Sequence, residues 1–279
     1  MRDNNKMTEI SINSINNQTR EAWNKTAQVW DEKMGDEGND FHKYLVRPNI
    51  EKLLQLKPEQ KILDVGCGNG LTTRRLASLG ANVLGIDFAS EMINYARQRT
   101  TKNQELIEYQ VVDATNETAL LKLGESSFDA AVSAMALMDM AEIEPLFRAL
   151  TKILRLNGYF VFAVMHPCFN SMHSNMGAEL IEDESNFYNE YFVKVKGYLK
   201  SSQKPGLALE NQPQPHIYFH RPLHCLLNTA FQVGFVLDWL EEPAFPPELA
   251  AKNITIGWCK FSEIPPVIVA RLRFLERVS

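Results

Sequence analysis

Short apolar runs alternate with helix-length segments through the middle of this 279-residue chain. A short apolar run bounded by turn residues is typical of a buried parallel strand, whereas apolar residues three or four apart are typical of a helix. Helical spacing follows the first two runs, at residues 71–79 and 90–97. The five runs lie at residues 62–65, 81–86, 107–112, 128–133 and 159–165. This alternation predicts an α/β fold with a doubly wound, Rossmann-like sheet.

The segments that flank this core show other patterns. Residues 1–17 are polar and rich in Asn, and we expect them to be disordered. Residues 18–57 carry apolar residues at helical spacing, with a second helix at about 40–56, and are expected to form an N-terminal helical cap. Residues 58–279 then form the main domain. Near its end a helix at 223–233 precedes two further strands, at 235–240 and 264–275.

Residues 166–217 interrupt the alternation directly after the fifth strand. At about 50 residues the segment is too long for an ordinary connection between a strand and a helix. It carries an aromatic stripe, an expected extra strand at 191–199 and a return rich in Gly and Pro at 204–215. We interpret it as a lid that shapes an acceptor site and excludes water. A dimerisation arm is the alternative.

The most specific pattern is Lys-Ile-Leu-Asp-Val-Gly-Cys-Gly-Asn-Gly at residues 61–70. The strand runs straight into glycines that allow positive φ and let a flat ligand lie against the main chain. A turn between a strand's carboxyl end and a helix is where doubly wound sheets bind nucleotide-like ligands. A dinucleotide fingerprint would need a third glycine at position 71, where this chain has Leu71. That departure counts against a nicotinamide-dependent oxidoreductase, which stays as an alternative.

The pattern D-x-G-x-G-x-G from Asp64 to Gly70 resembles motif I of the class I S-adenosylmethionine-dependent methyltransferases. The resemblance implies that Asp64 helps to position the methionine amino group of S-adenosylmethionine, and that Gly66 and Gly68 face its ribose and sulfonium. Cys67 lies among these cofactor-lining residues and is expected to fill space, not to act as a nucleophile. The resemblance also implies seven strands in the order 3-2-1-4-5-7-6, with the seventh antiparallel.

Later strand ends carry further cofactor candidates. Asp87 ends the second strand about 20 residues after the glycine turn, where an acid accepts hydrogen bonds from ribose hydroxyls. Phe88 follows it and is expected to pack against the adenine. By resemblance, Asp113 binds the adenine amino group and the Ala114 amide binds a ring nitrogen. Ser133, at the end of the fourth strand, completes the expected cofactor site.

Two residues are candidates for a base. Methyl transfer depends on alignment and on excluding water, and a hydroxyl acceptor usually also needs a base or a metal. His166 directly follows the fifth strand, and we interpret it as a base or an acceptor-positioning group, with a hinge for the lid as the alternative. Asp139 follows the fourth strand and is the second candidate, with a helix cap as its alternative role.

The expected acceptor is a small, partly apolar metabolite that is methylated on oxygen or nitrogen. Aromatic and methionine side chains are the candidates for its pocket, which are Trp23, Trp30, Phe41, Tyr44, Met138 and Tyr191, together with His166. Carbon methylation of a quinone-like ring is the alternative within the same chemistry. A module that binds S-adenosylmethionine without catalysis is a further alternative.

Composition narrows the class of partner. A net charge of −5 and a pI of about 5.8 argue against nucleic acid as the main partner. No apolar run approaches the roughly 20 residues of a membrane span. The four widely spaced cysteines, with no C-x-x-C pair, and a start without an apolar signal core predict a reduced, cytoplasmic protein. A homodimer stays open.

Metal ligands are not expected. His216, His220 and His224 are spaced by four, as on one helix face, but Pro215 and Pro222 interrupt such a helix.

Overall fold

The computed structural model describes residues 9–183, 186–250 and 257–275, and its centre is a seven-stranded sheet. Its strands are β1 (Lys61–Val65), β2 (Asn82–Asp87), β3 (Ile107–Val111), β4 (Phe128–Ala134), β5 (Leu154–Met165), β10 (Phe235–Glu241) and β11 (Val267–Phe274). The order across the sheet is β10-β11-β5-β4-β1-β2-β3. β11 is antiparallel to both of its neighbours, and the first five strands are parallel. This confirms the predicted order 3-2-1-4-5-7-6.

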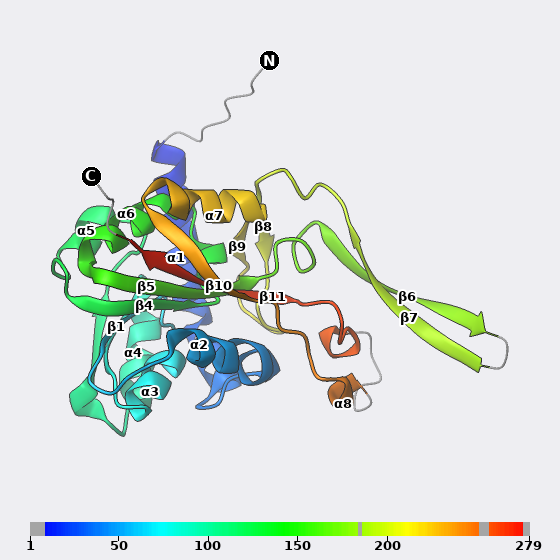
Figure 1. The fold of residues 1–279 in the computed structure, drawn as a ribbon, viewed down its shortest axis with the longest axis horizontal. Coiled ribbons are helices and arrows are strands. Elements are labelled where there is room, and N and C mark those ends of the chain that lie inside the picture. Colours follow the sequence, from blue (N-terminus) through cyan, green and yellow to red (C-terminus); the bar gives the residue numbers. More distant parts are fainter. Residues whose placement is uncertain (1–8, 184–185, 251–256, 276–279) are drawn as a thin grey trace, which may run out of the picture.

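Helices cover both faces of the sheet (Figure 1). They are α1 (Glu9–Met34), α2 (Arg47–Leu54), α3 (Leu71–Ser78), α4 (Ser90–Arg99), α5 (Glu117–Leu121), α6 (Glu144–Ile153), α7 (Leu223–Gln232) and α8 (Pro247–Ala250). The helices α5, α6 and α7 pack on one face, while α2, α3 and α4 pack on the other. Such crossovers put the carboxyl ends of β1 to β5 along one edge, where the chain re-enters helices.

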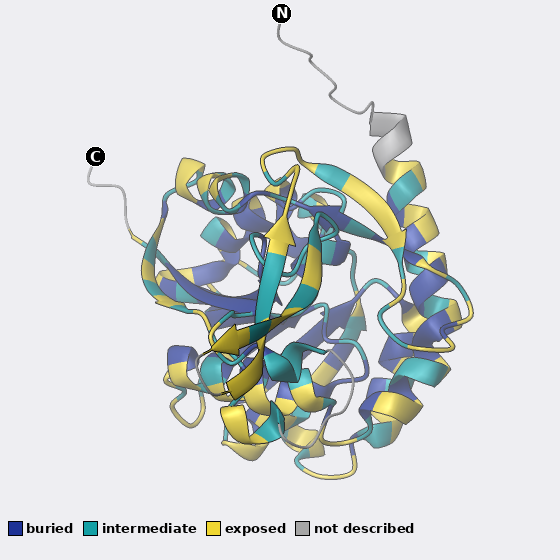
Figure 2. Ribbon diagram, turned by 90° about the vertical axis from the view of Figure 1, so that its right-hand side faces the viewer, coloured by how far each residue is buried: buried dark blue, intermediate teal, exposed yellow. Residues whose placement is uncertain are grey.

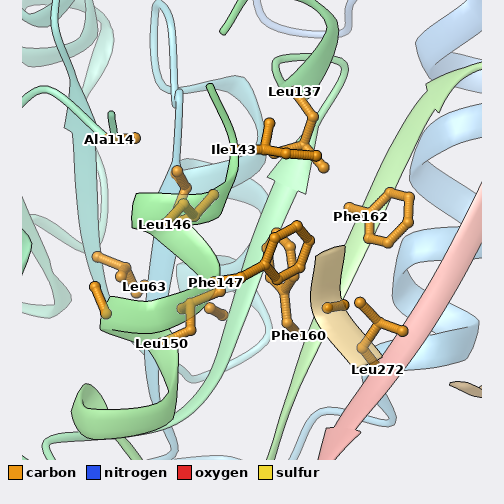
Figure 3. Packing of buried hydrophobic residues seen from close by; sticks show 14 of the residues in the cluster. Leu63, Ala114, Leu137, Ile143, Leu146, Phe147, Leu150, Phe160, Phe162 and Leu272 are labelled. Atoms are coloured by element: carbon orange, nitrogen blue, oxygen red, sulfur yellow. The ribbon is translucent and has the colours of Figure 1, made fainter. Parts of the chain in front are cut away.

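The core between the sheet and α6 is dense and aromatic (Figure 3). Phe147 from α6 lies edge-on to Phe160 from β5 and to Phe235 from β10, with ring centroids 5.8 and 6.1 Å apart. All three are almost fully buried, as is Leu63 from β1. Edge-to-face pairs of this kind add to the hydrophobic stabilisation of buried rings. The packing holds the strand ends, and therefore the site, in fixed positions.

Helix α1 begins earlier than the sequence suggests. Residues 9–17, which we expected to be disordered, are helical, whereas residues 1–8 lie outside the described part of the chain. The side chain of Asn16 donates hydrogen bonds to Asp113 and Thr115, at 2.6 and 3.0 Å. Polar composition alone therefore misjudged this segment, because the Asn16 side chain has partners on another element.

The second helix of the cap is split. A π-helical turn at Phe41–Val46 leads into α2, where one continuous helix was expected over about 40–56. Pro48 lies at the start of α2. Proline has no N–H to donate to the preceding turn, which accounts for the break at this point.

The insertion after β5 forms two hairpins with different placements. The first pairs β6 (Ser174–Asp183) with β7 (Asn186–Val195), and the second pairs β8 (Ser202–Gly206) with β9 (His216–His220). The β6–β7 hairpin projects away from the body, and its strands are largely exposed (Figures 1 and 2). β9 instead packs against α1 and the 3-10 turn Leu137–Asp139. Only the second hairpin thus lies where the lid was expected, and the expected strand at 191–199 belongs to the first.

Candidate active site

A crevice of about 870 Å³ lies at the carboxyl ends of β1 to β4, beside α1. Most of the cofactor residues expected from the sequence line it, together with two acceptor candidates. These residues are Asp64, Gly66, Cys67, Gly68, Asp87, Phe88, Asp113, Ala114, Trp23 and Trp30. The strand ends thus bring together residues that are spread over most of the N-terminal half of the chain.

The glycine turn lines the crevice with main chain. Gly66 has φ +69° and Gly68 has φ +54°, a region that L side chains rarely adopt. A Cβ on Gly66 would lie 2.5 Å from Ala136, so a side chain cannot fit there. A Cβ on Gly68 would meet only Trp30, at 3.7 Å, and would project into the crevice. The first glycine is needed for packing, and the second leaves room for a ligand against the backbone.

Asp64 carries an unpaired carboxylate oxygen at the base of the crevice. Its Oδ2 accepts a hydrogen bond from Thr73 Oγ1 at 2.6 Å, while its buried Oδ1 has no partner among the described residues. Burial raises the pKa of Asp64 to about 7. A buried carboxylate oxygen without a partner is costly, commonly by about 1–3 kcal/mol or more. The site therefore suits a ligand that brings a cationic hydrogen-bond donor.

Asp87 is fixed by the backbone at the tip of β2. Its Oδ2 accepts from the Gly68 amide at 3.0 Å and its Oδ1 from the Ala89 amide at 2.9 Å. Burial raises the pKa of this carboxyl to about 6. Each oxygen keeps a lone pair for a further donor, and the two bonds aim the carboxylate into the crevice beside the glycine turn.

Asp113 and Asn16 close one side of the crevice. Asp113 Oδ1 accepts from the amide and hydroxyl of Thr115, and its Oδ2 accepts from Asn16. Asn16 itself lines the crevice. Sequence reasoning missed Asn16, because nothing local marks an Asn in a polar segment as the partner of a distant carboxylate.

Helix α1 is anchored beside the site by a mostly buried acid. Asp31 forms an ion pair with Arg99 of α4, and its Oδ1 also accepts from Asn69 of the glycine turn at 2.9 Å. Trp23 and Trp30, further along the same helix, meet edge to face at 5.2 Å and line the crevice. The helical cap thus contributes these two tryptophans, both candidates for the acceptor pocket, to a wall of the crevice.

The other expected acceptor residues lie elsewhere. Tyr44 packs on Phe245, and Tyr191 of β7 packs on Phe261. Met138 lines a second cavity of about 940 Å³, between the end of β5 and the β8–β9 hairpin.

Two further candidates, Ser133 and Phe41, lie outside the crevice. Ser133 is fully buried within β4 and does not line the crevice; the neighbouring Ala134 and Met135 do. Phe41, named with the cap tryptophans, packs on Phe245. Strand periodicity explains the first difference, since adjacent side chains point to opposite faces.

His166 is placed outside both cavities. Its Nε2 is 2.8 Å from Glu242 Oε1, and its Nδ1 accepts a hydrogen bond from the Cys168 amide at 3.1 Å. It is 2% exposed, and burial lowers its pKa. Both ring nitrogens are engaged at the start of the insertion, so the geometry favours the hinge over the base.

Asp139 does line the crevice. It does not cap the next helix, because α6 begins at Glu144 with Ile143 as its capping residue. Around it, the crevice wall is made largely of methionines, namely Met34, Met92, Met135 and Met140.

The described residues hold neither a metal centre nor a membrane-spanning helix. Among residues 9–183, 186–250 and 257–275, no group of three or more His, Cys, Asp or Glu side chains is arranged to hold a metal ion. Within the same described residues, no helix combines the length and apolarity needed to cross a bilayer.

Comparison with known proteins agrees with this geometry. A methyltransferase-domain family model matches residues 63–162. The ubiquinone biosynthesis O-methyltransferase of Colwellia psychrerythraea is 31% identical over 186 residues, which cover 64% of this chain and 73% of that protein. The corresponding enzyme of Pelagibacter ubique is 27% identical over 214 residues, 71% of this chain and 87% of the relative. The chain belongs to the class I S-adenosylmethionine-dependent methyltransferases.

A solved structure shares the fold of this methyltransferase. The S-adenosylmethionine-dependent methyltransferase of Mesorhizobium loti superposes with a TM-score of 0.64 at 23% identity, over 81% of this chain and 96% of that one. The family match and the curated relatives make the protein an enzyme whose cofactor is S-adenosylmethionine, and the nicotinamide and non-catalytic alternatives fall away.

The residues present in this methyltransferase fit its cofactor. The unpaired Asp64 oxygen suits an ammonium group, and the Asp87 carboxylate suits hydroxyl donors. When bound, S-adenosylmethionine supplies a methyl group on a positively charged sulfur, from which it can be displaced. The chain's part is to hold both reactants in line and keep water out, and the tryptophans and methionines of the crevice provide that apolar enclosure.

Proposed function

We propose that this enzyme transfers a methyl group to oxygen or nitrogen of a small, partly apolar metabolite. The observation that carries the proposal is the mixed lining of the crevice. Trp23, Trp30, Met135 and Met140 contribute apolar surface to it, and Asp139 brings a carboxyl. Methionine side chains adapt to ligand shape, and aromatic rings offer flat contact surfaces. Such a pocket suits a compact ring or chain with one polar group to be methylated.

The proposal assigns roles within the cofactor site. Asp64 binds the methionine amino group, Gly66 and Gly68 contact ribose and sulfonium, and Cys67 fills the turn. Asp87 accepts from the ribose hydroxyls. These roles are supported by the orphan oxygen of Asp64, the open space at Gly68 and the backbone-held carboxylate of Asp87.

The residues that we assign to adenine binding line the same crevice. Phe88 packs against the adenine, Asp113 binds its amino group and the Ala114 amide a ring nitrogen. All three line the crevice, and Asn16 holds Asp113 in place. Ser133 is left out of this assignment because of its burial away from the crevice.

The curated relatives support oxygen as the acceptor atom. Those from Colwellia and Pelagibacter are named ubiquinone biosynthesis O-methyltransferases. We keep a small-molecule acceptor for this chain, and the cytoplasmic location predicted from its sequence.

A labelling experiment tests the proposal. The purified enzyme is incubated with S-adenosylmethionine that carries a ¹³C-methyl group and with a panel of small phenols, alcohols, amines and quinols. Label is expected on O or N of partly apolar members, and not on strongly charged ones. Label only on ring carbon, or only on polar charged acceptors, would overturn the assignment. Calorimetry with S-adenosylhomocysteine confirms in parallel that the cofactor site is intact.

A further inference from the structure

Two buried polar atoms face each other beside the crevice, and neither forms a regular hydrogen bond. The Nε2 of His216 lies 3.5 Å from the Oδ1 of Asp139. Neither atom has a hydrogen-bond partner among the described residues, and the His216 ring is fully buried. Asp139 lines the crevice, whereas His216 lies behind it. Buried polar atoms are nearly always paired, and these two have only each other within reach among the described residues.

Several strong interactions hold this pair in place. Asp139 ends the 3-10 turn Leu137–Asp139, and Arg221 binds the backbone around it. The guanidinium of Arg221 donates to the carbonyls of Leu137, Met140 and Ala141 at 3.2, 2.5 and 2.9 Å. Charge-assisted bonds to three carbonyls leave this turn little freedom. The Asp139 carboxyl is therefore presented to the crevice from a rigid base.

A hydrogen-bond relay sets the orientation of the imidazole. The Ala208 amide donates to Gln212 Oε1 at 2.9 Å, which directs the Gln212 amide nitrogen to His216 Nδ1 at 3.0 Å. Nδ1 is then an acceptor, so in the neutral ring the proton sits on Nε2, facing Asp139. Trp23 packs on the ring at a centroid distance of 4.6 Å and Tyr218 at 4.3 Å.

We propose that Asp139 is the general base for methyl transfer to a hydroxyl acceptor, and that His216 and Gln212 are positioning residues that orient its carboxylate. This inference rests on the proposed function and narrows its substrate class to alcohols and phenols. As the acceptor oxygen forms its bond to the methyl carbon, the carbon–sulfur bond breaks and its electron pair stays on sulfur. The hydroxyl proton passes to Asp139, and its bonding pair remains on the acceptor oxygen. A neutral amine needs no such base to attack.

The electrostatic surroundings suit this role. Burial raises the pKa of Asp139 well above its usual value, and the charge of Asp87 on β2 acts in the same direction. A carboxylate with a raised pKa is a stronger base near neutral pH. Burial lowers the pKa of His216 to about 4, so the ring stays a neutral N–H donor. Tyr218 also faces the pair, and burial raises its pKa, which keeps it neutral.

The first test compares Asp139→Asn with Glu125→Gln, an exposed carboxylate away from the crevice. The acceptor probes are 4-ethylphenol and 4-ethylaniline, which share one ring and differ in the acceptor atom. For Asp139→Asn we expect phenol methylation to fall about 10²- to 10⁴-fold. Aniline methylation and the Kd of S-adenosylhomocysteine should stay within about threefold. An equal loss with both probes, or no loss with phenol, would overturn the base.

The second test separates positioning from packing at His216. His216→Gln keeps a side-chain N–H donor, whereas His216→Phe keeps a ring without one. In the wild type, phenol methylation should rise with pH as Asp139 ionises. His216→Phe should shift the pH at which phenol methylation rises, and it should lower kcat more than it changes KM. His216→Gln should restore most of the wild-type pH profile and most of the wild-type kcat. Identical pH profiles for all three proteins would show a structural role only.

A third measurement needs no turnover and applies if neither probe is methylated. The ¹³C resonance of the Asp139 carboxyl is titrated in the complex with S-adenosylhomocysteine. A base must be ionised at working pH, so the carboxyl should lose its proton below about pH 8. A carboxyl still protonated above that pH rules out Asp139, whatever the acceptor. Cofactor binding with a titrating Asp139 but no probe methylated would instead count against the proposed acceptor class alone.

Discussion

The glycine turn after β1 and the insertion after β5 follow strands of the same sheet, but they are held by different kinds of contact. The turn is fixed by its own backbone, since Gly66 and Cys67 both donate to the Ile86 carbonyl of the adjacent strand. In the insertion, β9 is held by side chains from α1 and the turn after β4, such as Trp23 against His216. Local backbone geometry therefore fixes the glycine turn, whereas long-range packing fixes β9.

The two hairpins of the insertion differ from each other in how much they are buried against the rest of the protein. The β6–β7 hairpin has few partners beyond its own ladder, and Leu180 and Phe187 are each 68% exposed. A lone two-stranded hairpin is marginally stable in water. The β8–β9 hairpin is of similar design, yet Ile217 and Phe219 of β9 are buried. Burial against the body, and not the hairpin pattern, decides which part of the insertion can shape the crevice.

The largest expected effect contrasts the core with the projecting hairpin. Phe147→Ala should lower the free energy of unfolding by about 3–5 kcal/mol, because it leaves a cavity among buried rings. Phe187→Ala removes the same kind of ring from an exposed position and should change the free energy of unfolding by no more than about 0.5 kcal/mol. Denaturant unfolding of both variants measures the difference. A comparable loss for Phe187→Ala would mean that the hairpin is buried against a partner in solution.

The next effect concerns the cofactor site alone. Asp87→Ala removes a charged acceptor that the backbone holds at the crevice, which should cost about 1.5–3 kcal/mol of binding to S-adenosylhomocysteine. That corresponds to a Kd about 10- to 150-fold higher by calorimetry. Glu125→Gln is the matched control and should bind like the wild type. An unchanged Kd for Asp87→Ala would remove this residue from the cofactor site.

Because the pKa values of Asp64 and Asp87 are raised, both the stability of the protein and its cofactor affinity should depend on pH. Burial raises them to about 7 and about 6, so the cofactor-free folded protein binds protons that the unfolded chain releases above about pH 4. Stability of the cofactor-free protein is therefore greatest below that pH for these groups, and is lost as pH rises through 6 and 7.

Cofactor affinity should follow the opposite course. Binding needs both carboxylates ionised, so the Kd of S-adenosylhomocysteine should rise by up to about tenfold per pH unit between pH 7 and 6, where Asp64 is protonated. Below pH 6, where Asp87 is protonated as well, the rise should reach up to about a hundredfold per pH unit. Thermal melts and calorimetry across this range check the two trends. Asp64→Asn should flatten the stability trend, and an affinity independent of pH would show that these acids do not bind the cofactor as carboxylates.

The smallest expected effects come from shortening each hairpin in the same way. Joining Gly206 to His216, which are paired in the ladder, by an Asn-Gly turn removes the loop that carries Ala208 and Gln212. Cofactor affinity should fall by up to about tenfold, because Ala208 packs against the buried cluster that includes Trp23 and Met92, both of which line the crevice.

The matched variant shortens the other hairpin. Asn175 and Lys194 are also ladder partners, and an Asn-Gly turn between them removes the projecting tip. The Kd of S-adenosylhomocysteine should stay within about twofold, since the tip makes no contact with the crevice among the described residues. Equal effects of the two deletions would contradict the division of the insertion into a covering and a projecting hairpin.

Much of the fold was predictable, because its signals are local. Each apolar run and the glycine spacing constrain the backbone where they occur, and the strand order followed from the family resemblance. The start of α1 was not predictable in this way, since its order depends on Asn16 reaching Asp113 and Thr115. His166 likewise has a suggestive place in the sequence, but Glu242, from a distant segment, engages its ring.

The amino-acid sequence by itself determined that a strand, a glycine turn and acids at later strand ends form a nucleotide-type binding edge. Backbone conformation and strand alternation are set by neighbouring residues, so spacing is enough to specify them. Only the tertiary structure decided that Asp139 meets His216, that Asn16 joins the wall of the crevice and that Ala208 of the second hairpin packs against the cluster around Trp23. These features depend on burial and on contacts between distant segments, which exist only once the chain has folded.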